Sequence, residues 1–144
     1  MAQILIFEDD LEFATLLRES LEDTGHTVLL SRQSDRAFQM MVSGEVDLAL
    51  VDIFIQSEGA RATDGGFVLL GRLYARRHSL EGRKEPKIPI IAMSGGFRIR
   101  ELGDIDRYAR EYGADVTLTK PFRVETLLDE IDALLGNQPA WANG

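Results

Sequence analysis

The sequence Val46-Asp47-Leu48-Ala49-Leu50-Val51-Asp52 decides the fold of this chain. Its apolar part, Leu48 to Val51, is too short for a helix and predicts a strand buried on both faces, as in a parallel sheet. Asp52 closes this strand, and a carboxylate there loses hydration at a cost unless a cation or hydrogen bonds replace the water. Asp is also a common turn residue. The role of Asp52 therefore depends on the partners that the rest of the chain supplies.

Four more short apolar runs predict strands, and they alternate with segments of helical periodicity. Strands are expected at 4–7, 27–30, 88–93 and 116–118, and helices at 10–25, 34–44, 67–78, 99–113 and 124–136. This alternation predicts an α/β fold, a doubly wound sheet of five parallel strands joined by right-handed crossovers. In such sheets, ligands bind outside the carboxyl ends of the strands.

The first helix is expected to start after an N-cap at Asp10 and to stop at Gly25. Its apolar positions recur at spacings of three and four and are expected to face the core: Phe13, Leu16, Leu17 and Leu21. His26 and His78 have no carboxylate or histidine partner at ligand spacing. Both histidines are therefore interpreted as surface residues.

Length, charge and cysteine content exclude several classes of protein. The 144 residues suit one domain, expected to bury about two-thirds of the surface of the unfolded chain. A net charge of −8 argues against nucleic-acid and anionic-membrane binding, and the absence of cysteine excludes disulfides and thiol chemistry. No secretory signal or membrane-spanning apolar stretch is visible, so a cytoplasmic location is expected. The domain is expected over 1–136, with a tail over 137–144.

Polar residues close the predicted strands. Glu8, Asp9 and Asp10 follow the first strand, Asp52 ends the third, Ser94 the fourth and Lys120 the fifth. Parallel strands bring these residues to one edge of the sheet. Carboxylates gathered there repel one another unless a cation lies among them, and such oxygen ligands suit Mg²⁺. A lysine and a serine hydroxyl can contact phosphate oxygens. The set predicts phosphoryl transfer onto a carboxylate.

The sequence closely resembles the receiver domain of two-component response regulators over roughly residues 3 to 136. Four stretches carry the resemblance in the expected order: ILIFEDD (4–10), DLALVDIF (47–54), AMSGG (92–96) and GADVTLTKPF (113–122). The resemblance implies the flavodoxin-like receiver fold with strand order 2-1-3-4-5, which the family exemplifies. It also implies a phosphoprotein of two-component signal transduction, with Mg²⁺ as cofactor.

The resemblance assigns a role to each matching residue. Asp52 matches the phosphoacceptor, Glu8 and Asp9 match the acidic pair that organises Mg²⁺, and the backbone carbonyl of Phe54 matches the third protein ligand. Ser94 matches the hydroxyl that contacts the phosphoryl group.

Lys120 matches the lysine that pairs with the phosphoryl group in the family, and the Lys120–Pro121 peptide bond is expected to be cis. The implied partners are a histidine kinase or a histidine phosphotransfer protein, and a downstream protein target that the sequence does not identify. A homodimer is one option. The implied domain is not an enzyme acting on other molecules, because its chemistry is confined to phosphorylation and autodephosphorylation of its own aspartate.

Three departures from the family pattern concern what happens after phosphorylation. Thr117 stands where the family usually has an aromatic switch residue. The loop after Asp52 is about five residues longer than the common form, and Gln56 to Thr63 is either a mobile flap beside the site or an inert surface loop. Ser94 is followed by two glycines instead of the commoner alanine.

Three other functions are alternatives for this sequence. A phosphohydrolase of the haloacid dehalogenase type needs an acid/base two residues after the nucleophile, and Phe54 occupies that position. Nucleotide binding is not indicated, because the sequence contains neither a G-x-G-x-x-G turn nor a P-loop. The remaining alternative is a receiver-like interaction module that is not phosphorylated and signals only by contact. The acids, the serine and the lysine together favour the phosphoacceptor.

Overall fold

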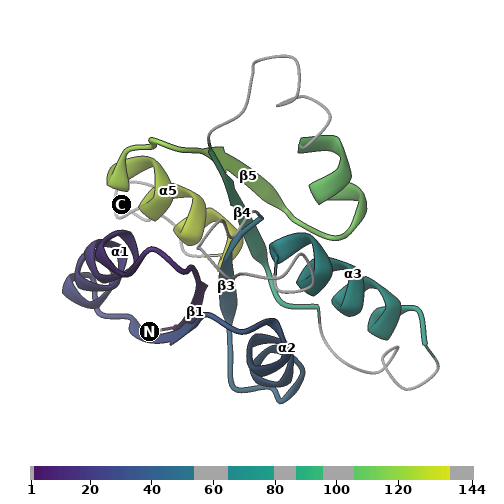
Figure 1. Ribbon diagram of the computed structural model, residues 1–144. Coiled ribbons are helices and arrows are strands. Elements are labelled where there is room, and N and C mark those ends of the chain that lie inside the picture. Colours follow the sequence, from purple (N-terminus) through teal and green to yellow (C-terminus); the bar gives the residue numbers. More distant parts are fainter. Residues whose placement is uncertain (1, 54–64, 80–86, 96–105, 137–144) are drawn as a thin grey trace.

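The sheet positions everything else in the molecule. The structure is a computed structural model that describes residues 2–53, 65–79, 87–95 and 106–136. Its strands are β1 Gln3–Phe7, β2 Thr27–Ser31, β3 Leu48–Asp52, β4 Ile90–Ser94 and β5 Val116–Thr119. They pair in parallel in the order β2-β1-β3-β4-β5 (Figure 1). The predicted doubly wound sheet with order 2-1-3-4-5 is therefore confirmed.

Helices cover both faces of this sheet. The bounded helices are α1 Leu11–Asp23, α2 Ser34–Val42, α3 Gly66–Arg77 and α5 Val124–Leu134, and residues 106–111 are also helical. α1 and α5 pack on one face and α2 and α3 on the other, so each face has its own apolar cluster. None of the described helices is long and apolar enough to cross a membrane.

The central strands are buried because helices cover both of their faces. All five residues of β3 and all five of β4 are buried. Alternate residues of β3 enter opposite clusters: Ala49 and Val51 pack toward α3, while Leu48 and Leu50 pack toward α1 and α5. This explains why β3 reads as a continuous apolar run instead of an alternating one.

The first helix starts where the sequence predicts. The side chain of Asp10 accepts a hydrogen bond from the backbone N–H of Phe13 at 3.2 Å, which satisfies one of the free donors of the first turn. The chain turns after α1 at Gly25, whose φ of 95° lies in the left-handed region that glycine adopts without strain. The cap and the stop together set the length of α1.

Two expectations for single residues were wrong. Leu16 is 53% exposed, because the buried stripe of α1 is formed by Ala14, Leu17 and Leu21. Leu16 lies about 100° around the helix from Leu17 and falls outside this stripe. His26 is buried, and its Nδ1 accepts a hydrogen bond from the backbone N–H of Ala2 at 3.2 Å. His78 is exposed, as expected.

Candidate functional site

The ends of three neighbouring strands place Glu8, Asp52 and Ser94 next to one another. Phe7 pairs with Val51 in the register of β1 and β3, so Glu8 and Asp52 follow as neighbours at the carboxyl edge of the sheet. Asp52 pairs with Met93 on the other side, and Ser94 is the next residue of β4. Residues 44 positions apart in sequence thus become adjacent through strand register alone.

Three carboxylates meet at this edge. Oxygen atoms of Glu8, Asp9 and Asp52 all lie within 4.8 Å of one another, and they are the acidic members of the predicted metal site. Glu8 is only 3% exposed and Asp52 only 5% exposed, while Asp9 is half-buried. Hard oxygen donors that are partly open to water are the ligands that Mg²⁺ prefers. The donor set therefore fits Mg²⁺.

Lys120 is the cation of this cluster. Its Nζ donates to Oε2 of Glu8 at 2.9 Å and to Oδ2 of Asp52 at 3.3 Å. One lysine faces three carboxylates, so the cluster retains negative charge. The arrangement leaves the site electrostatically suited to a divalent cation.

Burial and the contacts among the charged groups determine the pKa values of this cluster. Burial raises the pKa of Glu8 to about 7; the nearby charge of Asp52 adds to this rise, and Lys120 opposes it. Burial acts to lower the pKa of Lys120, but the hydrogen bond to Glu8 and the charge of Asp52 outweigh it, so this pKa is raised. Lys120 therefore remains charged at neutral pH, whereas Glu8 changes between its protonated and its ionised form near pH 7.

Further contacts hold both the backbone and the side chain of Lys120. Its backbone N–H donates to the carbonyl of Ser94 at 2.6 Å, and the Lys120–Pro121 peptide bond that follows is cis, as the family resemblance implies. Its Nζ lies 4.5 Å from the ring centroid of Phe13, within the range of cation–π attraction. The Phe13 ring meets Phe122 edge-on, with centroids 5.8 Å apart.

Phe13 was expected only as an apolar residue of α1. No local sequence signal pairs it with Lys120, because the two residues are far apart in the chain and meet only once α1 packs on the sheet face that it shares with α5. The one available hint is its place three residues after the Asp10 cap. That place puts Phe13 in the first turn of α1, at the edge where the strands end.

A glycine allows α3 to begin against the end of β3. The backbone N–H of Gly66 donates to the carbonyl of Ile53 at 3.0 Å. A Cβ at Gly66 would overlap the carbonyl oxygen of Asp52. The first turn of α3 therefore contacts the backbone of Asp52 directly, and only a residue without a side chain fits there.

Comparison with known proteins identifies the family. The model of the response regulator receiver domain matches residues 4–132. The chain belongs to the response regulator receiver family. The receiver domain is 28% identical over 140 residues to the response regulator ArlR of Staphylococcus saprophyticus, covering 96% of this chain and 54% of that protein. It is 30% identical over 137 residues to the transcriptional regulatory protein CpxR of Klebsiella pneumoniae, covering 94% and 50%.

The receiver domain thus spans about half the length of these curated relatives. Among solved structures, a CheY-like receiver domain protein from Methanospirillum hungatei matches with a TM-score of 0.72 and 22% identity, over 94% of both chains. The Francisella response regulator 1452 receiver domain matches with a TM-score of 0.73 and 18% identity, over 94% of this chain and 98% of that one. At this level of identity, these matches show the fold alone.

The departures from the family pattern are only partly described. Thr117 is half-buried in β5 beside Ala92 of β4. Its Oγ1 is buried and has no hydrogen-bond partner within the described part of the chain. Ser94 is the last residue of β4 and is buried. Phe54, the Gln56–Thr63 loop and the tail lie outside the described residues.

Proposed function

We propose that this receiver domain takes a phosphoryl group onto Asp52, with Mg²⁺ held by Glu8, Asp9, Asp52 and the carbonyl of Phe54. The observation that carries the proposal is the position of Lys120, whose Nζ reaches both Glu8 and Asp52 inside a cluster of three carboxylates. A structural ion pair would need one carboxylate. A site for a divalent cation and a phosphoryl group needs the excess of acids together with a lysine.

The reaction is a transfer between two side chains. The donor is a phosphohistidine of a histidine kinase or a histidine phosphotransfer protein. A carboxylate oxygen of Asp52 forms the new P–O bond as the P–N bond breaks, and the electron pair of that bond stays on the departing imidazole nitrogen. When bound, Mg²⁺ would neutralise the negative charge that develops on the phosphoryl oxygens.

Lys120 and Ser94 act on the phosphoryl group once it is attached. Lys120 Nζ leaves its shared position between Glu8 and Asp52 and donates to a phosphoryl oxygen. The hydroxyl group of Ser94, at the end of the adjacent strand, donates a hydrogen bond to another phosphoryl oxygen. These movements rearrange the surface at the carboxyl ends of the strands, and a downstream protein binds the altered surface. The chain modifies itself and turns over no separate substrate.

Intact-mass spectrometry after incubation with acetyl phosphate and Mg²⁺ tests the proposal. The protein should gain one phosphoryl group, and Asp52→Asn should gain none. Asp23→Asn, at the exposed end of α1, is the matched control and should be labelled like the unaltered protein. Label that persists in Asp52→Asn contradicts the assignment of the acceptor. No label in the unaltered protein favours the alternative, an interaction module that is not phosphorylated.

A further inference from the structure

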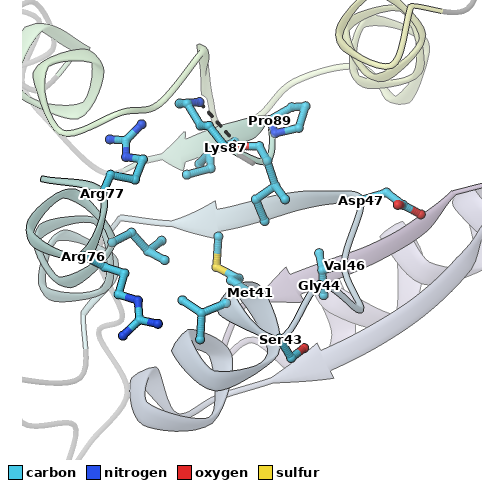
Figure 2. Close-up of a pocket in the computed structure, with 13 residues that line it drawn as sticks. Met41, Ser43, Gly44, Val46, Asp47, Arg76, Arg77, Lys87 and Pro89 are labelled. Atoms are coloured by element: carbon cyan, nitrogen blue, oxygen red, sulfur yellow. Dashed lines mark hydrogen bonds between the residues drawn. The ribbon is translucent and has the colours of Figure 1, made fainter. Parts of the chain in front are cut away.

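A cavity of about 470 Å³ lies at the amino ends of the strands, the end of the sheet opposite Asp52. It opens where Val46 and Asp47 lead into β3 and Pro89 leads into β4, between the last residues of α2 and the last turn of α3 (Figure 2). The phosphoacceptor stands at the other end of β3. This cavity is therefore separate from the site described above.

The cavity has an apolar interior. Met41 of α2, Val46 before β3 and Leu73 of α3 line it and are at most 8% exposed, and Ile88 and Pro89 extend the same wall. Its volume falls in the range of about 300 to 1,000 Å³ that is typical of small-molecule sites. An apolar body can therefore be buried there.

Positive charge gathers around this apolar wall, although the whole chain carries a net charge of −8. Arg76 and Arg77 end α3 and line the cavity with Lys87, and Figure 2 shows the two arginine side chains diverging from the helix. Lys87 is neutralised by Asp115 at 2.7 Å. The carboxylate of Asp47 accepts a hydrogen bond from the backbone N–H of Gln3. A ligand head group would therefore meet Arg77 of α3 rather than the paired Lys87.

Arg77 is incompletely satisfied. Its Nη2 donates to the carbonyl of Tyr112 over a long 3.4 Å. Its Nε is buried and has no hydrogen-bond partner within the described residues. The C-terminal end of α3 attracts a cation, which accounts for the charge but leaves the unmatched donor unexplained. An anion at the cavity would supply an acceptor to a guanidinium that otherwise lies against Gly113 and makes this one long hydrogen bond.

We propose that this cavity binds a small amphipathic anion. The apolar part of the ligand packs against Met41, Val46 and Leu73, and its carboxylate or phosphate head group binds the guanidinium of Arg77, which turns from the Tyr112 carbonyl toward the cavity. The planar guanidinium matches either head group through paired hydrogen bonds. A ligand of this chemistry uses both the apolar wall and the uneven charge of the cavity.

Amide NMR titration of the unphosphorylated protein tests this proposal with four probes: octanoate, octyl phosphate, octanol and inorganic phosphate. Octanoate or octyl phosphate should produce saturable shifts at residues 41–47, 73–77 and 87–90. The better of these two anions should bind at least about ten-fold more tightly than octanol, the scale of one hydrogen bond to a charged group. The ratio of the two anions identifies the preferred head group. Inorganic phosphate, which lacks the apolar part, should bind more weakly than either.

Arg77→Met keeps the length of the side chain, removes its charge and deletes an unmatched buried donor, so the variant should fold. It should lose the preference for the anions over octanol, and Arg77→Lys should restore part of it. Arg18→Met, at an exposed ion pair on α1, is the control and should bind like the unaltered protein. Octanol binding as tightly as the anions, shifts centred elsewhere, no saturation, or full anion preference in a folded Arg77→Met would each overturn the proposal. No phosphodonor is present, so the outcome is independent of Asp52.

Discussion

The buried carboxylate of Glu8 makes the stability of the metal-free protein depend on pH. Its pKa is about 7 in the folded protein against an ordinary value of 4.5. At about 1.36 kcal/mol per pH unit, this difference corresponds to about 3 kcal/mol. The folded state holds the proton more tightly than the unfolded state. The stabilisation is therefore fully present below pH 4.5, and it is lost as pH rises through 7.

Glu8→Gln removes this titration while keeping the shape of the side chain. Because other groups also titrate, the quantity to follow is the free energy of unfolding of Glu8→Gln minus that of the unaltered protein. From pH 5 to pH 8.5, this difference should shift in favour of the variant by about 2 to 3 kcal/mol. Urea denaturation in the presence of a chelator measures it at both values of pH.

Glu19→Gln, on the exposed side of α1, is the matched control, and its difference from the unaltered protein should be nearly constant across the same range. The reasoning fails if the Glu8→Gln difference is also constant, because Glu8 would then be ionised in the folded protein throughout. The reasoning also fails if the shift has the opposite sign, since Lys120 would then outweigh burial.

Four further outcomes are expected. Asp9→Asn should weaken Mg²⁺ binding, measured by calorimetry, without destabilising the metal-free fold, because it removes one of several crowded carboxylates; unchanged affinity would place the metal elsewhere. Phe13→Leu should slow phosphorylation by acetyl phosphate about two- to five-fold, the scale of one cation–π contact with Lys120, whereas Leu11→Ala, an exposed change on the same turn, should leave the rate unchanged. Gly66→Ala should lower the free energy of unfolding by about 1 to 3 kcal/mol, the range for overpacking, whereas Gly71→Ala, where a Cβ meets nothing within 4 Å, should not. Because Thr117 is small and stiff, a phosphoryl mimic should change amide shifts at 54–66 and 94–98 more than at 105–120; the reverse ranking would show that the switch does not need an aromatic residue there.

The spacing of apolar and polar residues predicted those features of the fold that depend on a single strand or a single helix. The apolar run before Asp52 indicated a strand covered on both faces, and the resemblance to the receiver family implied the strand order. Leu16 and His26 were misjudged because their burial depends on packing around α1, which residue spacing does not determine. The contact of Phe13 with Lys120 and the cavity at the far edge arise only when distant elements meet. Apart from the place of Phe13 in the first turn after the Asp10 cap, the sequence gives no local sign of either.

The placement of Gly66 has a mechanical consequence. α3 starts in contact with the carbonyl of Asp52 and ends at Arg77. This single helix of 12 residues therefore runs from the carboxyl ends of the strands to their amino ends, a length of about 18 Å at 1.5 Å per residue. A movement of the Asp52 backbone that displaces the first turn of α3 would also displace its last turn, because the helix moves as a unit. Thermodynamic linkage then requires reciprocity: a ligand that binds differently to the two positions of α3 would change the equilibrium of phosphorylation by the same factor as phosphorylation changes its affinity.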